Sequence, residues 1–321
     1  MLIAVFLFIV GLVLLIKGGD WFVDGATGIA HKFRIPDIII GATVVSIGTT
    51  LPEVMVSATS ALSGHGEMAY GNAIGSIICN TALIAALTIA IKPAKIDKKT
   101  LSLPIAVFFI AAILYATVAY STGKFTRGIG IILLFIFAAY LLFSVRTALK
   151  SAREETEATS KENNENLIKN ILLLVIGAAL IALGANLLVN NGTLIAEALG
   201  VPEKVIALTF IAIGTSLPEL VTAVTALVKG HGALSLGNVI GANIFNLVLV
   251  SGVASALSPF SIPNNSQIAG INSSLVIDIP VMLLTMAFLT LPALIRGKLT
   301  RAQGIILLCI YASFCTVQFI L

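Results

Sequence analysis

Ten apolar stretches follow one another along the chain, separated by short segments that contain charged residues, Gly or Pro. About 20 apolar residues in a helix cross the hydrocarbon core of a bilayer, and each stretch is long enough to do so. The pattern therefore predicts an all-α membrane protein with ten transmembrane helices. Their approximate limits are 2–24, 35–63, 68–91, 101–121, 127–147, 167–190, 201–228, 233–257, 268–295 and 301–321.

The sequence contains an internal repeat. Residues 41–53 (GATVVSIGTTLPE) resemble residues 207–219 (ALTFIAIGTSLPE), and residues 71–80 (GNAIGSIICN) resemble residues 237–246 (GNVIGANIFN). Both pairs are separated by 166 positions (207 minus 41), which indicates a duplication without gaps. Each half holds five helices, an odd number, so the second half enters the membrane from the opposite side. We therefore predict two inverted repeats.

One long polar segment, residues 150–166, separates the two halves. It is rich in Glu, Lys, Asn, Ser and Thr, a composition typical of a solvated linker. The predicted organisation is a first repeat at 1–149, the linker, and a second repeat at 167–321.

The basic residues orient this arrangement in the membrane. Only Lys124, Arg127 and Lys204 fall on the side that carries both termini, so 16 of the 19 Lys and Arg (19 minus three) fall on the linker side. Cytoplasmic loops carry the excess of Lys and Arg. We expect a multi-pass plasma-membrane protein with a cytoplasmic linker and both termini outside.

Composition excludes several classes of protein. The chain is 58% hydrophobic and 11% charged, with a mean hydropathy of +1.06, which excludes a water-soluble globule and leaves no room for a separate enzyme domain. No basic stripe with interleaved aromatics suggests a nucleic-acid partner. The three cysteines lie in apolar segments without metal-ligand or disulfide spacing. We expect no permanently bound cofactor, the lipid bilayer as surroundings, and a monomer.

Two carboxylates stand out because they lie within predicted helices. Glu53 and Glu219 occupy equivalent positions in the two repeats, so the pseudo-two-fold axis brings them together near the middle of the membrane. Two converging carboxylates repel each other unless protons or cations lie between them. Ca²⁺ binds six to eight oxygens and fits this requirement. A third acid, Asp278, has no acidic counterpart; we expect it to form local hydrogen bonds below the outer surface, with contact to the ion path as the alternative.

Neutral oxygen donors surround the two glutamates in the sequence. Positions four apart share one face of a helix, so hydroxyl and amide side chains line up beside each carboxylate. These donors are Thr49 and Ser57 beside Glu53, Thr215 beside Glu219, Asn72, Ser76 and Asn80 in the third helix, and Asn238 and Asn246 in the eighth. We expect Asn80 and Asn246 to be ligands, whereas Asn72, Asn238 and Asn243 are equally compatible with structural roles.

The backbone signals are also duplicated. Pro52 and Pro218 remove a helical hydrogen bond and predict bent helices with exposed carbonyls near the ion site. Two GxxxG pairs, Gly71 with Gly75 and Gly237 with Gly241, predict close helix packing.

Other polar residues are expected to be solvated. Asp20 and Asp24 fall near Lys17 at helical spacing and predict a charge cluster at the cytoplasmic end of the first helix. We expect His65 and His231 in short outer loops, in solvated or capping roles.

The doubled IGT[ST]LPE and GNxIG[SA]xxxN motifs, the first preceded by a Gly at position 41 in the first copy, within ten helices divided by a linker, resemble the calcium/cation antiporter superfamily. Within it, the chain is most similar to the prokaryotic sodium/calcium exchangers. The resemblance covers essentially the whole chain. It implies eight core helices around the ion site, with helices 1 and 6 lying across them as a sliding gate.

The resemblance also implies a set of ion ligands. Glu53 and Glu219 match the two essential acids, while Ser46 and Ala212 match positions that offer backbone carbonyls. The remaining matches are Thr49, Thr50, Thr215, Ser216, Ser76, Asn80 and Asn246. The chain departs from archaeal relatives at Ala242, where a ligating Ser is usual, and at Asn246, where some members have Asp.

These observations predict a secondary-active antiporter that exchanges Ca²⁺ for Na⁺ by alternating access, and not an enzyme. A Ca²⁺/H⁺ exchanger is the alternative within transport, because protons can also neutralise the glutamates. A passive cation channel is the alternative of another class, and a membrane protease with paired acids is a third.

Overall fold

The fold is built almost entirely from helices. The computed structural model describes residues 2–94, 97–158, 166–200, 214–264 and 267–320. The helices of the first half are α1 (Leu2–Phe33), α2 (Asp37–Ile40), α3 (Ser46–Leu62), α4 (Gly66–Cys79), α5 (Ala86–Ile91), α6 (Lys98–Ser121) and α7 (Arg127–Ala158). Those of the second half are α8 (Leu167–Ala198), α11 (Leu217–Val228), α12 (Gly232–Phe245), α13 (Ser251–Leu257), α14 (Ile279–Arg296) and α15 (Arg301–Ile320).

Short π-helical segments interrupt several of these helices. They are η1 (Gly41–Val45), η2 (Asn80–Ala85), η4 (Asn246–Val250) and η5 (Ser274–Asp278). The described chain also contains two-residue strands at β1 (Lys124–Phe125), β2 (Phe260–Ser261), β3 (Gln267–Ile268) and β4 (Ile271–Asn272).

The predicted spans agree with the structure. Within the described ranges, nine continuous helical runs are long and apolar enough to cross a membrane, and α11 is a shorter apolar helix. The first part of the predicted helix 201–228, residues 201–213, lies outside the described residues.

α1 and α8 extend further than the apolar pattern predicts. α1 ends where Arg34 adopts a φ of 52° and Pro36 follows.

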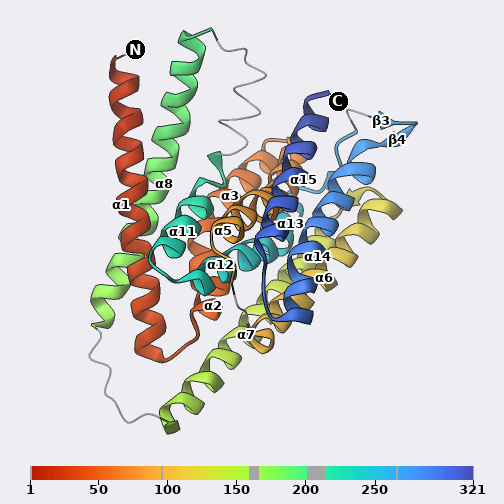
Figure 1. The fold of residues 1–321 in the computed structure, drawn as a ribbon. Helices are drawn as coiled ribbons and strands as arrows, with labels where there is room; N and C mark the ends of the chain where they lie inside the picture. The colour runs from red at the N-terminus through yellow and green to blue at the C-terminus, as the bar shows by residue number, and fades with distance from the viewer. Residues whose placement is uncertain (1, 95–96, 159–165, 201–213, 265–266, 321) are drawn as a thin grey trace.

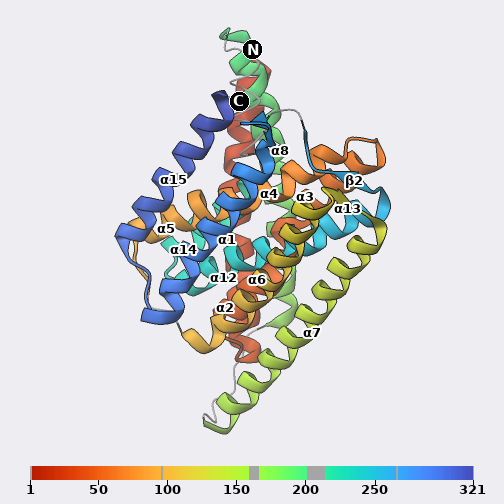
Figure 2. The same ribbon diagram turned by 90° about the vertical axis from the view of Figure 1, so that its right-hand side faces the viewer.

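The ends of the helices alternate as ten membrane crossings require. Figures 1 and 2 show both termini at one end of the bundle and the end of α7 at the other, the linker side. At the termini side, β1 pairs antiparallel with β2, with Phe125 opposite Phe260. At the linker side, the backbone N–H of Leu299 donates a hydrogen bond of 2.8 Å to the carbonyl of Ala94.

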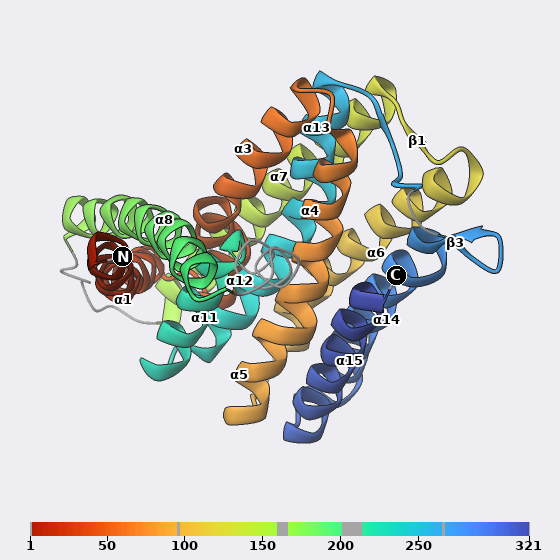
Figure 3. The same cartoon turned by 90° about the horizontal axis from the view of Figure 1, so that it is seen from above.

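α1 and α8 form a close antiparallel pair at one edge of the bundle (Figure 3). A Cβ added to Gly11 would lie 2.9 Å from the carbonyl oxygen of Gly184, and one added to Gly18 would lie 2.9 Å from that of Gly177. Gly177 and Gly184 are the equivalents of Gly11 and Gly18 at the 166-residue offset. The pseudo-two-fold axis therefore interchanges the two contacts. Both contacts lie between α1 and α8, the first helices of the two repeats.

The GxxxG prediction holds for the pair in α12. A Cβ at Gly237 would meet the carbonyl oxygen of Ile38, and one at Gly241 would meet the side chain of Ser46. For Gly71 and Gly75, no described residue lies within 4 Å of such a Cβ. The equivalent partner positions, 204 and 212, fall outside the described residues, so close packing of this pair stays a prediction.

The two prolines act differently on the backbone. Pro218 lies in the first turn of α11, directly after a turn at Thr215 and Ser216, as the predicted interruption requires. Pro52 lies inside α3, which stays helical on both sides of it, so the predicted bend there stays a prediction. In the first repeat the irregular backbone lies earlier, in η1. Pro lacks the backbone N–H that would donate to the carbonyl four residues earlier, but the loss of this one hydrogen bond does not by itself end a helix.

Candidate ion-binding site

Four helices, two from each repeat, meet at the centre of the bundle. α3 packs against α4 and α11, and α12 packs against α3 and α11 (Figures 1 and 3). These helices carry many of the buried polar side chains of the described residues, among them the two fully buried carboxylates. This concentration of polar groups makes the centre of the bundle the candidate site.

Glu53 on α3 and Glu219 on α11 are fully buried there, with an exposed fraction of 0% each. Their carboxyl groups are close enough to interact electrostatically. None of the four carboxyl oxygens accepts a hydrogen bond from any residue that the structure describes. Buried carboxylates without protein partners are costly, so this pair requires a cation or protons.

Asn80 and Asn246 form a second symmetric pair. Both are fully buried, and neither amide makes a side-chain hydrogen bond to the described residues. Asn80 is the first residue of η2 and Asn246 is the first residue of η4. Single π-helical turns occur frequently at functional sites, because they shift the alignment of carbonyls and side chains. The structure thus places both predicted amides at equivalent irregularities.

A third symmetric pair consists of hydroxyls. Thr50 and Ser216, related by the 166-residue offset, are buried, and their hydroxyl groups lack partners in the described part of the chain. The neighbouring pair is less symmetric. Thr49 is buried and donates to Oδ1 of Asn238 at 3.3 Å, whereas Thr215 is only half-buried. Thr49 and Thr50 both lie near the Glu219 carboxyl group.

The remaining predicted ligands, Ser46, Ser76 and Ala212, differ in their burial and hydrogen bonds. Ser46 is buried and its hydroxyl donates to the carbonyl oxygens of Gly41 and Asn238, at 2.8 and 3.0 Å. Ser76 is buried on α4, and its equivalent Ala242 is fully buried without a side-chain oxygen. Ala212 lies outside the described residues, so its role stays a prediction.

Asn72 and Asn243, two asparagines whose role the sequence did not decide, form side-chain hydrogen bonds to neighbouring segments. Asn72 on α4 donates to the Glu53 carbonyl at 3.1 Å and to the Ser57 hydroxyl at 2.9 Å. Asn243 on α12 donates to the Thr81 hydroxyl at 2.7 Å and so joins the two repeats. The Asn72 bonds thus connect α4 to α3, which carries Glu53, and the Asn243 bond connects α12 to η2.

Sequence reasoning missed one candidate, Thr222. It lies three residues after Glu219 on α11, is fully buried, and its hydroxyl has no partner among the described residues. The i, i+3 spacing was the available signal, since such residues share a helix face. Its equivalent in the first repeat is Val56, so symmetry did not reveal it.

The α1–α8 pair lies directly against this site. A small cavity is lined by Phe22 of α1, by Gly48, Thr49 and Pro52 of α3, by Pro218 of α11, and by Ala178, Ile181 and Ala182 of α8. The ring of Phe22 packs where Gly48 has no side chain. α1 and α8 therefore cover the part of α3 and α11 that carries Thr49, Pro52 and Pro218.

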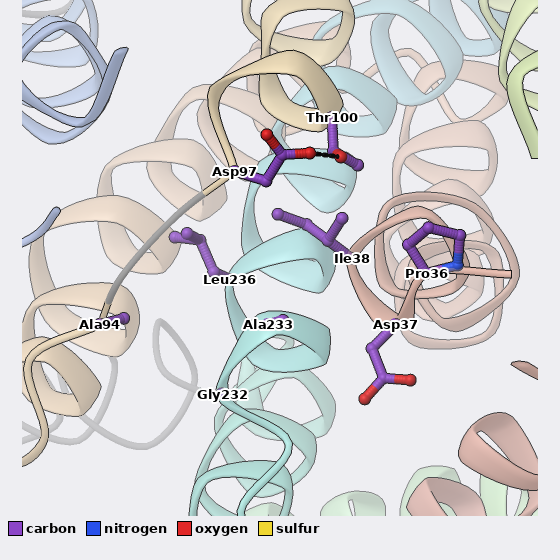
Figure 4. Close-up of a pocket in the computed structure, with 9 residues that line it drawn as sticks. All are labelled: Pro36, Asp37, Ile38, Ala94, Asp97, Thr100, Gly232, Ala233 and Leu236. Atoms are coloured by element: carbon purple, nitrogen blue, oxygen red, sulfur yellow. Dashed lines mark hydrogen bonds between the residues drawn. The ribbon is translucent and has the colours of Figure 1, made fainter. Parts of the chain in front are cut away.

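A second pocket opens on the linker side and is not an ion cage. It is lined by Asp37 and Asp97 together with apolar residues, and Figure 4 shows that the two carboxylates point away from each other. Asp97 caps α6 and accepts a hydrogen bond from the Thr100 hydroxyl, while Asp37 contacts His231 Nδ1 at 3.0 Å. His231 thus lies on the linker side, and the expectation of an outer loop was wrong for it. The inverted repeats require His65 and its equivalent to lie on opposite sides.

The charge cluster of α1 also has a partner that the sequence did not reveal. Lys229, after the end of α11, contacts Asp20 and Asp24 at 3.4 and 2.8 Å. These residues are far apart in the sequence, so helical spacing pointed only to Lys17.

Comparison with known proteins gives the same architecture. Residues 3–146 and 169–320 match the sequence pattern of the family described as "Sodium/calcium exchanger protein". The chain belongs to this family. The two matched segments fall in the two halves of the chain and leave out the whole of segment 150–166. Membership makes the chain a membrane transporter of the cation-antiporter type and not an enzyme.

Several curated relatives cover most of the chain. The inner membrane protein YrbG of Escherichia coli is 38% identical over 265 residues, which is 81% of each chain. An uncharacterized membrane protein of Methanocaldococcus jannaschii, MJ0091, is 36% identical over 310 residues, or 95% of this chain and 94% of its own length. The sodium/calcium exchanger MaX1 of Methanosarcina acetivorans is 30% identical over 347 residues, 97% of each chain.

A solved structure confirms the predicted fold class. The structure of the sodium-calcium exchanger NCX_Mj soaked with Na⁺ and Sr²⁺ superposes with a TM-score of 0.81, at 34% identity and 97% coverage of both chains. The resemblance to the prokaryotic sodium/calcium exchangers is confirmed as well.

Proposed function

We propose that this antiporter exchanges Ca²⁺ for Na⁺ across the plasma membrane by alternating access, with Glu53 and Glu219 as the shared cation ligands. The observation that carries the proposal is the set of three symmetric pairs of buried side chains without described partners: Glu53 with Glu219, Asn80 with Asn246, and Thr50 with Ser216. Two charges and several neutral oxygens suit one Ca²⁺ or more than one Na⁺.

Neutral ligands are necessary for this site. No group of three or more His, Cys, Asp or Glu side chains that could hold a metal occurs among the residues described. The two carboxylates supply the charge, and the amide, hydroxyl and carbonyl oxygens complete the coordination. We assign these roles to Asn80, Asn246, Thr49, Thr50, Thr215, Ser216 and Ser76, with backbone carbonyls of Ser46 and Ala212.

Exchange follows from competition for one pair of charges. Ca²⁺ neutralises Glu53 and Glu219 alone, and Na⁺ ions that bind the same carboxylates displace it. An empty pair of ionised carboxylates is costly to enclose, so the α1–α8 pair moves only when the site is occupied. This dependence converts binding into counter-transport and prevents a leak.

The proposal includes topology. The repeats at 1–149 and 167–321 are joined by a cytoplasmic linker at 150–166, with both termini outside. Support comes from the excess of Lys and Arg on the linker side and from the position of both termini at one end of the bundle.

Ion-substituted flux tests the choice of counter-ion. Purified protein in liposomes is given an outward Na⁺, H⁺ or K⁺ gradient, one at a time, and Ca²⁺ uptake is measured. Uptake driven by Na⁺ without a pH gradient supports the proposal. Uptake driven by a pH gradient in Na⁺-free medium identifies a Ca²⁺/H⁺ exchanger, and unitary currents without counter-transport identify a channel.

A further inference from the structure

A third intramembrane acid, Asp278, lies outside the central site. Asp278 is the last residue of η5, at the termini side of α14, and is half-buried. Within the described part of the chain, no Lys, Arg or His forms an ion pair with it. One oxygen, Oδ1, accepts a hydrogen bond of 2.7 Å from the amide of Gln318 on α15. A neutral amide does not compensate the charge, so the carboxylate still requires a counter-charge.

Two residues with hydroxyl groups, Ser274 and Tyr70, lie in the neighbourhood of this carboxylate. Ser274, one turn earlier, is buried and lies beside Asp278. Tyr70 on α4 is 1% exposed, and its hydroxyl lies near both Ser274 and Asp278. Nevertheless, the Tyr70 hydroxyl makes no hydrogen bond to any described residue. A buried hydroxyl without a partner near an uncompensated carboxylate requires an explanation, and a bound cation would satisfy both groups.

The backbone at Asp278 resembles that at the central site. η2 and η4 begin at the proposed ligands Asn80 and Asn246, and η1 ends directly before Ser46. η5 is the remaining π-helical segment described, and it carries Ser274 and Asp278 at its ends. A π-helical turn shifts carbonyl groups out of register with the normal helical donors. The same device therefore accompanies oxygen ligands at both places.

The duplication does not account for this cluster. The positions equivalent to Asp278, Ser274 and Tyr70 are Ala112, Phe108 and Leu236. Polar groups at the central site mostly come in pairs, whereas this cluster is confined to one side of the molecule. It therefore has a role that the symmetric ion site does not explain.

We propose that Asp278, Ser274 and Tyr70 form a second Na⁺ site, separate from the Glu53–Glu219 pair and located on the termini side. A single carboxylate with hydroxyl oxygens neutralises a monovalent cation, whereas Ca²⁺ would leave an uncompensated positive charge in the membrane. Bound Na⁺ would join α4 to η5 and so stabilise the outer end of the core.

Hydrogen–deuterium exchange of the segment 274–278 tests this site without transport. The protein carries Glu53→Gln and Glu219→Gln, which remove the central charges, and is compared in NaCl and in choline chloride of equal ionic strength. At a Na⁺ concentration about ten times the dissociation constant, opening of the segment is suppressed about tenfold. Asp278→Asn should abolish this protection, and Tyr70→Phe should weaken it.

The matched control is Tyr115→Phe. Tyr115 is also a fully buried tyrosine without a described hydrogen-bond partner, but its hydroxyl neighbour is Ser251. Na⁺ should protect segment 274–278 in this variant as in the parent. Protection that is absent in the parent, or retained in Asp278→Asn, overturns the proposal. Exchange protection of segment 274–278 that changes with pH but not with Na⁺ concentration also overturns the proposal, since a proton would then neutralise Asp278. None of these outcomes bears on exchange at the central site.

Discussion

Lys229 donates a hydrogen bond of 2.8 Å to the Asp24 carboxylate and so ties the end of α11 to α1 at the linker side. It also donates to the backbone carbonyl of Asp20 at 3.0 Å. The equivalents of Asp20 and Asp24 are Asn186 and Asn190, which bond to each other at 3.0 Å. The equivalent of Lys229 is Ser63, so this charged contact has no counterpart at the symmetry-equivalent positions.

Breaking this tie should loosen α1 at the linker side. Partly exposed ion pairs contribute about 0.2–1 kcal/mol, so Lys229→Gln should accelerate hydrogen exchange in residues 17–24 by up to about fivefold. A double-mutant cycle with Asp24→Asn should give coupling of that size, which high salt reduces. Strict additivity of the two substitutions would show that the contact does not hold α1.

The glycine contacts between α1 and α8 should tolerate no added side chain. A Cβ at Gly18 would lie 2.8 Å from the backbone nitrogen of Ile181, and backbone cannot yield as a flexible side chain does. Gly18→Ala should lower the free energy of unfolding by about 1–3 kcal/mol, measured by thermal unfolding in detergent. The control, Gly128→Ala, meets only the Thr126 hydroxyl at 3.8 Å and should be neutral or slightly stabilising. Equal effects of both substitutions would contradict close packing of the pair.

The amides at the starts of η2 and η4 should contribute to cation affinity. Asn246→Ala or Asn80→Ala removes one oxygen ligand, and the apparent Ca²⁺ affinity should fall about tenfold or more, measured by calorimetry. Asn191→Ala is the control, because this buried amide donates to the Leu187 carbonyl on α8, away from the carboxylates. Unchanged affinity in both site variants would exclude the amides as ligands.

Asp97 should make the start of α6 sensitive to acid. The hydrogen bond from the Thr100 hydroxyl, helped by the Lys99 backbone N–H, lowers the pKa of Asp97 from its ordinary value of 3.8. A lowered pKa stabilises the fold above the unfolded value and loses this contribution as pH falls through the folded value. Asp97→Ala should therefore destabilise the start of α6 by about 0.5–2 kcal/mol at neutral pH and remove its acid sensitivity below about pH 4. Asp97→Asn should retain the helix cap but lose the titration. The measurement is hydrogen exchange of residues 98–102 as a function of pH in the unchanged protein and both variants. The same dependence on pH in all three proteins would contradict this role of Asp97.

The sequence predicted the spans and the inverted repeats because membrane crossing forces each helix to be apolar over its length, and duplication left an ungapped offset. It also predicted that Glu53 and Glu219 are buried, since motif and symmetry agree at both. The lengths of α1 and α8 were underestimated, because their polar last turns continue as helix beyond the apolar pattern.

Other features depend on contacts that a linear pattern does not contain. The π-helical turns at Asn80 and Asn246 have no local sequence signal, because tertiary packing decides them. Lys229 reaches Asp24 from a helix in the other repeat, so spacing along the chain could not reveal it. The same Pro also occupies different places in the two repeats, inside α3 at Pro52 and in the first turn of α11 at Pro218, although the local sequences are nearly identical.

The central claim is that cation exchange requires both buried carboxylates. The direct measurement is Na⁺-gradient-driven Ca²⁺ uptake into proteoliposomes by Glu53→Gln and Glu219→Gln, each compared with Glu197→Gln, a change at an exposed position on α8. The account predicts uptake at the level of protein-free liposomes for each site variant and normal uptake for the control, with all three proteins folded. Uptake like that of the unchanged protein in either Glu53→Gln or Glu219→Gln would contradict it.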